Sequence, residues 1–301
     1  MGRFPAQGPG VSAELATTPK PTLEWFQPLL YDKNSTVAVI AIKAIAKQGS
    51  GVKACLPELI RLVDAELPTI ATAAIEAVIK VGPADEIFPV LKAKLSSENV
   101  LPSIRTVTAK AILELNLAEP SIGVPIYAEL TRSTDPSIRV SALKKLAGCG
   151  KASKSEIAAV VERFADSEAA VKSAALDVIV ALGPDGLGSL VAVQKLATPD
   201  EKDGVGHKAI GTLGKLGPKS AGALATALGA KWDEETAVKI VTMLGEFGKE
   251  ARPAAAAIFD AVAKSGHPLA TLRQKQLEAA ASGKDWEPDP ASAALTKIGG
   301  D

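Results

Sequence analysis

Two histidines and two cysteines are the side chains of this 301-residue chain best suited to metal binding or nucleophilic attack. His207 and His267 are 60 residues apart. A zinc or di-iron site needs clustered ligands, so we expect no metal and no other cofactor. Cys55 and Cys149 are 94 residues apart, and no histidine or basic cluster adjoins either one. We therefore expect two structural thiols and no reactive one.

Glycine-rich stretches can cradle phosphate groups, and the two densest in this chain span residues 183–188 and 204–206. Neither contains the Lys-Ser or Lys-Thr pair of a phosphate-binding loop, and no strand precedes either. We interpret both as turns that end helices. Since no catalytic constellation is present, we expect the protein not to be an enzyme.

The composition limits the class of partner. The chain carries 34 basic and 34 acidic residues, so its net charge is zero. A dedicated nucleic-acid binder needs an excess of positive charge, so we expect no nucleic acid as partner. No uninterrupted apolar run approaches the roughly 20 residues of a membrane span, so we expect no membrane insertion. Hydrophobic residues make up 47% but aromatic ones only 4%, which favours closely packed helices.

One sequence phrase recurs through most of the chain. A β-branched first residue is followed by a small one after four and seven positions, an apolar one after eight, and glycine after twelve. The first residues of the seven clear copies are 31 to 34 residues apart, and an eighth copy near Thr271 is degenerate. They are Val37, Ile70, Ile104, Ile138, Val171, Val205 and Thr236.

The spacing within the phrase is that of an amphipathic helix. Offsets of 0, 4, 7, 8 and 11 lie on one helix face. The closing residue is glycine in six copies and Asn116 in one, which are residues that commonly end helices. Aspartate or asparagine precedes the phrase by five or three positions as an expected N-cap, at Asp32, Asn99, Asp135, Asp166, Asp200 and Asp233.

A second apolar segment precedes each phrase, with examples at 56–62, 87–92, 124–130 and 157–162. Each repeat is therefore expected to contain a helix A, a short turn and a helix B, with helix B carrying the phrase. A single pair cannot bury its apolar face alone, so stacking must supply the core. We predict an all-α fold, a right-handed α-α superhelix of about eight helix pairs.

The pattern resembles HEAT repeats, in the short bacterial form related to phycobilisome-lyase-like repeats. The resemblance rests on the Pro-Leu pairs of helix A, on Asp-Pro-Ser-Ile-Arg at 135–139 and on the Ala-rich phrase of helix B. It covers roughly residues 21 to 283. It implies an armadillo-type solenoid, but it does not specify a function, because such folds serve many roles.

The position after the first residue of the phrase is often arginine in HEAT repeats, and only the middle copies of this chain are basic there. One interpretation is that these basic side chains pair with the aspartates of neighbouring repeats and so form an internal ladder of ion pairs. The other is a strip on the concave helix-B surface that binds an acidic partner, spread over roughly 20 Å. In the copies that begin at Ile104 and Ile138, a lysine also lies six residues after the first residue of the phrase. The candidate partner-binding residues are Arg105, Lys110, Arg139, Lys144 and Lys172.

We expect a non-catalytic scaffold or assembly subunit that binds a protein or peptide on the concave helix-B surface. One alternative is a bilin lyase-like enzyme, which co-purified tetrapyrrole absorbance would reveal. Another is a nucleic-acid-binding solenoid, which steep salt dependence would reveal. The sequence does not define the oligomeric state.

The ends of the chain differ from the repeats. Residues 1–20 contain three prolines and three glycines and read as a flexible lead-in. They lack the features of a secretory signal, so we expect a cytoplasmic protein. Residues 284–301 read as a C-terminal tail that folds back on the last helices. We expect the aromatic residues near both ends to cover the exposed end faces of the solenoid, namely Trp25, Phe26, Tyr31, Trp232 and Trp286.

Overall fold

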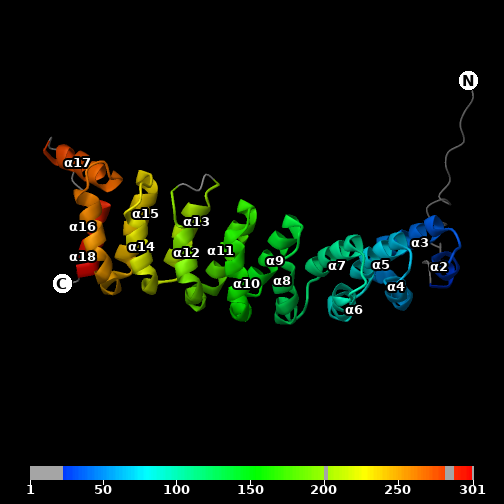
Figure 1. The fold of residues 1–301 in the computed structure, drawn as a ribbon. Coiled ribbons are helices and arrows are strands. Elements are labelled where there is room, and N and C mark those ends of the chain that lie inside the picture. Colours follow the sequence, from blue (N-terminus) through cyan, green and yellow to red (C-terminus); the bar gives the residue numbers. More distant parts are fainter. Residues whose placement is uncertain (1–22, 200–202, 282–287, 300–301) are drawn as a thin grey trace, which may run out of the picture. The chain divides into compact units, whose positions relative to one another are not determined.

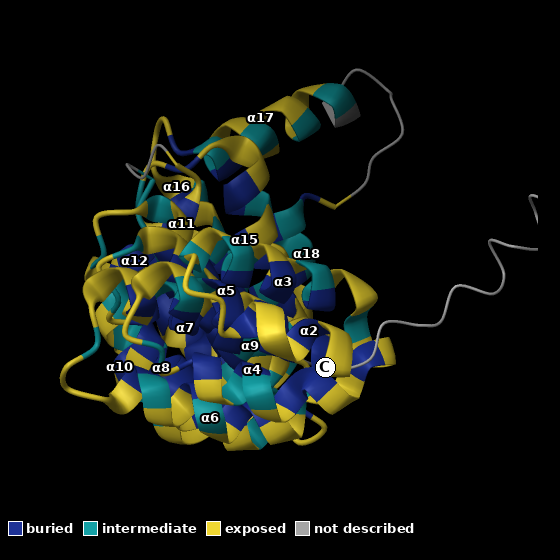
Figure 2. Ribbon diagram, turned by 90° about the vertical axis from the view of Figure 1, so that its right-hand side faces the viewer, coloured by how far each residue is buried: buried dark blue, intermediate teal, exposed yellow. Residues whose placement is uncertain are grey.

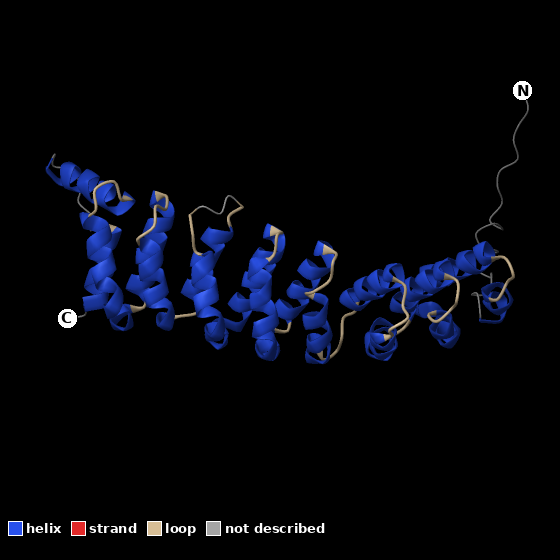
Figure 3. Ribbon diagram, viewed as in Figure 1, coloured by secondary structure: helices blue, strands red, loops and turns tan. Residues whose placement is uncertain are grey.

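The computed structural model describes residues 23–199, 203–281 and 288–299. Within these ranges it contains helices and turns but no strand (Figures 1 and 3). The helices alternate between helix A and helix B of successive repeats, as the sequence predicts. The predicted all-α solenoid of about eight helix pairs is confirmed. The chain divides between Ala118 and Glu119 into two compact units, which are described separately.

Unit 1 contains three helix pairs (Figure 1). The helix B segments α3, α5 and α7 pack on one another in this order, and each also contacts the helix A that precedes it. The pairs are α2 (Leu23–Leu30) with α3 (Ser35–Gln48), α4 (Leu56–Leu62) with α5 (Pro68–Val81), and α6 (Ala84–Ser96) with α7 (Pro102–Glu114).

Unit 2 contains five further pairs among its described residues. Successive helix B segments again pack on one another, from α9 through α11 and α13 to α15. The pairs are α8 (Val124–Leu130) with α9 (Pro136–Gly148), α10 (Ile157–Glu162) with α11 (Ala169–Leu182), α12 (Leu190–Leu196) with α13 (Val205–Lys215), α14 (Ala221–Leu228) with α15 (Glu234–Glu246), and α16 (Ala255–Ala263) with α17 (Pro268–Ala281).

A last helix, α18 (Pro290–Gly299), closes the end of unit 2. It packs on α15 and buries Ala291, Ala294 and Ile298. The two helices approach so closely that a Cβ atom on Gly245 would lie 2.9 Å from the Cα atom of Ala294. By contrast, α17 is largely exposed along its length (Figure 2). The tail helix therefore covers the apolar side of α15.

The core follows the predicted helix face. In α11 and in α13 all five positions of the phrase are buried, namely Val171, Ala175, Val178, Ile179 and Leu182, and Val205, Ala209, Thr212, Leu213 and Leu216. Burial of each larger apolar side chain contributes about 1.5–3 kcal/mol. The stacking of neighbouring repeats thus supplies the core, as the offsets predict.

The glycines that close the phrase have two different physical roles. At five of the six the backbone φ is positive, a conformation that disfavours other residues, namely Gly49, Gly150, Gly183, Gly217 and Gly248. Gly82 differs, since its φ is −97°. There a Cβ atom would lie 2.7 Å from Ile87 and 2.9 Å from Leu56, so lack of space requires glycine.

The predicted N-caps are confirmed at Asp135 and Asp233 but wrong at other positions. Asp135 accepts a hydrogen bond from the N–H of Ser137, and Asp233 accepts one from Thr236. The helices that follow Asp32, Asn99 and Asp166 begin later than predicted, and their N-cap residues are Asn34, Leu101 and Glu168. Asp32 and Asp166 instead accept from the N–H two residues ahead, within the preceding turn. Asp200 lies outside the described residues.

The aromatic residues do not cover the ends as predicted. In the first repeat Trp25 and Tyr31 are 58% and 53% exposed, whereas Phe26 is buried. Trp232 is buried inside unit 2, where its indole N–H donates to the carbonyl of Ala227 at 2.9 Å. Trp286 lies outside the described residues. Of the predicted aromatic residues, only Phe26 is thus buried in a terminal helix of the described residues, while α18 buries small and aliphatic side chains at the other end.

One helical stretch of the described residues, 169–196, is long and apolar enough to cross a membrane by length and composition. Gly183, with its positive φ, breaks this stretch into α11 and α12, which the 3-10 segment η5 (Gly183–Ser189) connects. Both helices pack against their neighbours in unit 2. The stretch is accounted for as two core helices of the solenoid.

Two glycines of α13 provide a matched test of this packing. A Cβ atom on Gly206 would lie 2.0 Å from the carbonyl oxygen of Thr198, whereas one on Gly211 would meet only the end of the Lys239 side chain at 3.8 Å. We expect Gly206→Ala to lower the free energy of unfolding by about 1–3 kcal/mol. Gly211→Ala should raise it by about 0.5–1 kcal/mol, because alanine favours the helix. Urea unfolding measures both, and equal effects would contradict the packing described.

Candidate functional site

Arg139, a predicted partner-binding residue, is buried at the turn between helix A and helix B. Its guanidinium donates hydrogen bonds to the carbonyl oxygens of Ser133 at 3.0 Å and Thr134 at 3.3 Å. It also donates to Asp166 of the next repeat at 2.7 Å, and the two side chains are 11% and 5% exposed. This is the internal ladder that the sequence offers as one interpretation. The guanidinium joins two successive repeats.

Arg105 holds the same repeat position but is exposed. Its guanidinium donates to the carbonyl oxygens of Leu95 at 2.9 Å and Ser97 at 3.0 Å, where α6 ends. The C-terminal carbonyls of a helix lack internal partners and carry partial negative charge, so a cation stabilises them. The Arg105 side chain thus acts as a cap on α6.

The Asp166 carboxylate is held in its charged form by this ladder. Burial would raise the pKa of Asp166, but the hydrogen bonds from Arg139 and from the N–H of Glu168 outweigh it. The net effect is a pKa below the ordinary value. The buried ion pair is therefore intact at neutral pH.

The three predicted lysines lie elsewhere on the helix B segments. Lys110 on α7 and Lys144 on α9 are exposed at the same repeat offset, while Lys172 on α11 is half-buried. Lys110 and Arg105 belong to unit 1, and the other three predicted residues belong to unit 2. Arg139 and Lys172 share one offset on the packed helices α9 and α11. That these five side chains contact a partner stays a prediction.

A groove opens between the helix B segments α5 and α7 of unit 1. We call it the helix-B groove, and its cavity volume is about 370 Å³. Its apolar part consists of half-buried Ile79 and Val107 and buried Ala111. Charged side chains complete the lining, namely Glu76, Lys80, Lys110 and Glu114. An apolar strip with charged margins can accommodate a peptide side chain.

The charges of the helix-B groove alternate in a regular way. Six residues after the first position of the phrase, Glu76 on α5 is matched by Lys110 on α7. Four residues further on, about 6 Å along the helices, Lys80 is matched by Glu114. At the first of these two positions the acidic residue is on α5, and at the second it is on α7. The four formal charges sum to zero.

Sequence reasoning found only Lys110 among the residues that line this groove. The predicted residues lie one and six positions after the first residue of the phrase, whereas the lining also includes the positions three, seven, nine and ten after it. The missing signal was available in the sequence, since Ile79 and Val107 are apolar at offsets that the buried face does not use. Comparison of every exposed offset between adjacent repeats could have located the groove.

The helix B segments of unit 2 are joined by their own side chains. The ammonium of Lys208 on α13 lies 2.7 Å from Asp177 and 2.7 Å from Ser173, both on α11. Met243 of α15 packs over Gly214 of α13, where a Cβ atom would lie 2.3 Å from its sulfur. These contacts occupy the surface between helices at positions where unit 1 has its groove.

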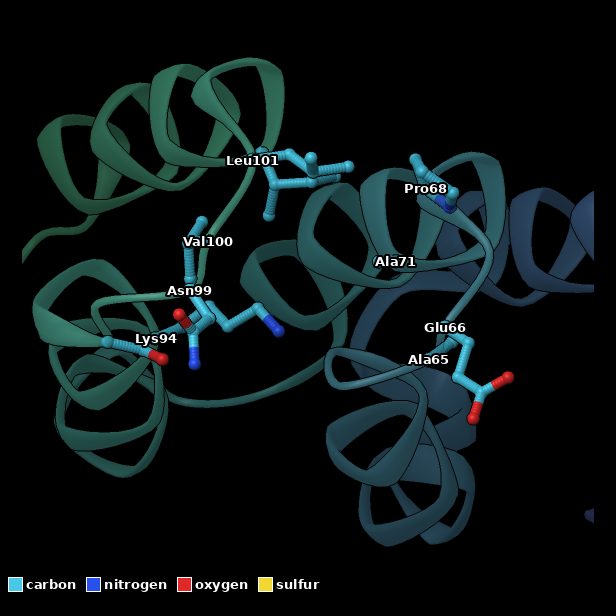
Figure 4. Close-up of a pocket in the computed structure, with 10 residues that line it drawn as sticks. Ala65, Glu66, Pro68, Ala71, Lys94, Asn99, Val100 and Leu101 are labelled. Carbon is cyan, nitrogen blue, oxygen red and sulfur yellow. The ribbon is translucent and has the colours of Figure 1, made fainter.

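A second cavity, of about 310 Å³, lies between two turns of unit 1 (Figure 4). We call it the turn pocket. It lies between the α4–α5 turn, which contributes Ala65 and Glu66, and the α6–α7 turn, which contributes Asn99 and Leu101. Its other lining residues are Pro68, Ala71, Lys94, Ser97, Val100 and Ile104. Unlike the helix-B groove, it presents backbone turns and an amide side chain.

The histidines and cysteines are engaged separately. His207 pairs with Asp233 at 3.1 Å, whereas buried His267 contacts the carbonyl oxygen of Leu228 at 2.9 Å. Among the described residues no three His, Cys, Asp or Glu side chains group as a metal site. Burial raises the pKa values of both Cys55 and Cys149. A raised pKa lowers the thiolate fraction, which disfavours nucleophilic chemistry.

Comparisons with known proteins inform the fold. No family model and no curated protein matches the chain. An engineered protein of known crystal structure matches with a TM-score of 0.56 at 16% identity, over 92% of this chain and 89% of that one. This likeness shows the fold alone and agrees with a HEAT-like helical-repeat solenoid.

Two crystal structures of Kap121p are also similar, one of them bound to Nup53p. They match 92% of this chain but only 32% and 37% of the Kap121p chains. Their identities are 15% and 13%, with TM-scores of 0.42 and 0.44. At these scores neither structure contributes to the functional argument.

The two arginines at the same repeat position should differ in their contribution to stability. Arg139→Met leaves a buried carboxylate without its partner, so we expect the free energy of unfolding to fall by about 3–5 kcal/mol. Arg105→Met removes one part-buried and one exposed hydrogen bond and leaves no buried charge unpaired, so we expect a loss of about 1–2 kcal/mol. Chemical denaturation of both variants tests this, and a loss for Arg105→Met equal to that for Arg139→Met would refute the assignment.

The Arg139 effect should also depend on pH. The pKa of Asp166 is lower in the folded protein than its ordinary value of 3.8, so the resulting stabilisation is present above that value. This stabilisation is lost as the pH falls below 3.8 and through the lower pKa that Asp166 has in the folded protein. We expect the difference in unfolding free energy between wild type and Arg139→Met to be largest at pH 7 and to shrink near pH 3. A constant difference would exclude the ion pair as its source.

Proposed function

We propose that the protein is a non-catalytic interaction scaffold that binds a segment of a partner protein in the helix-B groove. The observation that carries this proposal is the groove itself, an open strip of apolar side chains between α5 and α7 with charges on both margins. A cavity of this volume holds one or two side chains, so the segment has to run along the groove and insert an anchor.

The charges of the groove define the kind of segment. A basic side chain of the partner would face Glu76 or Glu114, and an acidic one would face Lys80 or Lys110. The anchor between them would be aliphatic, because it contacts Ile79 and Val107. Charge complementarity of this type contributes specificity more than affinity. A polyanion fits poorly, since two carboxylates line the groove, which weighs against the nucleic-acid alternative.

Several finer assignments belong to the same proposal. The short bacterial, phycobilisome-lyase-like repeat type rests on the sequence phrases. A cytoplasmic location is supported by the two free thiols, which persist in reducing compartments. A scaffold role without catalysis is supported by the separate engagement of the histidines and by the raised thiol pKa values.

Site-specific photo-cross-linking tests the groove. A photo-reactive amino acid at Val107 should cross-link one protein in cells of the source organism, whereas the same group at exposed Thr226 of α14 should not. Val107→Glu introduces a charge into the apolar strip, so we expect it to weaken retention of that protein at least tenfold, with unchanged circular dichroism. Thr226→Glu is the matched control and should retain it fully.

Other outcomes would reject the proposal. A partner that a folded Val107→Glu variant retains at wild-type level would place the binding surface elsewhere. Enrichment of a tetrapyrrole, recognised by its absorbance, would favour the bilin lyase-like alternative. Enrichment of nucleic acid, with a retention that falls steeply as the salt concentration rises, would favour the nucleic-acid-binding alternative.

A further inference from the structure

The turn pocket of unit 1 occupies the position that an arginine fills in unit 2. The α4–α5 turn and the α8–α9 turn have equal lengths, with Leu62 and Leu130 ending helix A and Pro68 and Pro136 beginning helix B. In this register Ala71 of α5 corresponds to Arg139 of α9. Ala71 lines the turn pocket, so the pocket begins where the longer side chain is missing.

The hydrogen-bond acceptors of Arg139 also have counterparts in the turn pocket. Ser133 and Thr134, whose carbonyls accept from Arg139, correspond to Ala65 and Glu66. Asp166, the third acceptor, lies three residues before α11 begins, and Asn99 lies three residues before α7 begins. All three counterparts line the pocket. The positions that surround a guanidinium in unit 2 therefore recur in unit 1, with alanine in place of arginine and the amide of Asn99 in place of the Asp166 carboxylate.

From this correspondence we propose that the turn pocket binds the guanidinium group of an arginine side chain on a partner protein. The inference rests on the proposed function only for the source of that arginine. The carbonyl oxygens of Ala65 and Glu66 and the amide oxygen of Asn99 would accept its hydrogen bonds. Guanidinium carries several donors in a rigid planar fork, so it matches three acceptors better than a lysine ammonium does.

The charges around the turn pocket favour a cation. The ammonium of Lys94, which lines the pocket, lies 2.8 Å from the Asp64 carboxylate. This pair is formally neutral, and Glu66 adds one negative charge at the rim, where its exposed carboxylate points away from Asn99 and Lys94 (Figure 4). Leu101 and Pro68 give the pocket an apolar side, against which the methylene stem of an arginine can pack.

A small-molecule titration tests the pocket without knowledge of the partner. The probe is N-acetyl-L-arginine amide, added to the full chain at constant ionic strength and followed by amide NMR shifts. We expect saturable shifts at residues 64–68 and 97–102, with a Kd on the order of 1 mM, as befits one side chain. The citrulline analogue, a neutral isostere, should cause less than a tenth of the occupancy at equal concentration.

Variants then distinguish this site from general arginine binding. Ala71→Arg with Asn99→Asp should rebuild the ladder of unit 2, raise the unfolding temperature and weaken probe binding at least tenfold. Because Ala71 is buried, Asn99→Leu at the exposed rim provides a second test, with at least a threefold weakening expected. Ala93→Arg, on the exposed face of α6, is the matched control and should bind the probe as wild type does.

Three results would overturn the proposal. They are absence of saturable shifts at the pocket, equal shifts with the citrulline analogue, and unchanged affinity in a folded Asn99→Leu variant. None of them depends on the helix-B groove. If the wild-type chain does not bind the probe but cross-links a protein at Val107, the turn-pocket proposal alone is rejected. If it binds the probe but cross-links no protein at Val107, the proposed function alone is rejected.

Discussion

The stacking of helix B on helix B is the contact on which the rest of each unit depends. A single helix pair has no partner for its apolar face, so every repeat is stable only against its neighbours. Alanine makes this contact close, as in α5, where Ala71, Ala73, Ala74 and Ala77 are all buried. Small residues at the interface bring the helix axes near one another. They also leave little depth for large side chains, which accounts for the low aromatic content.

Close stacking leaves one repeat position free to vary. The residue after the first position of the phrase lies at the edge of the interface, beside the turn between helix A and helix B. In α9 it is Arg139, which joins two repeats through Asp166. In α7 it is Arg105, which caps α6, and in α5 it is Ala71, which ends at its Cβ atom and leaves a cavity. The same position can therefore join repeats, cap a helix or leave space, depending on side-chain length and on the acceptors nearby.

The periodic features were predictable because they follow from local geometry. The offsets of the phrase specified the buried face of α11 and α13, and the closing glycines marked the helix ends. Features that depend on neighbouring turns were not predictable from one repeat. Aspartate is common at N-caps, which is why the sequence predicts one at Asp166, but this carboxylate accepts a hydrogen bond from the guanidinium of Arg139, 27 residues earlier in the chain. The groove depends likewise on pairs of residues in different repeats.

The repeat comparison also explains how the groove and the turn pocket of unit 1 arise. Where adjacent helix B segments carry side chains long enough to reach one another, as Lys208 reaches Asp177, the surface between them is occupied by the chain's own contacts. Between α5 and α7, Val107 holds the offset of Lys208 and a groove lies beside it, while Ala71 holds the offset of Arg139 and lines the turn pocket. Ile104 and Ala111 belong both to the buried face of α7 and to the linings, but the exposed lining residues, such as Glu76, Lys80 and Asn99, can change without loss of the core. A solenoid can in this way keep one packing rule in every repeat while the exposed lining between repeats differs from one pair to the next.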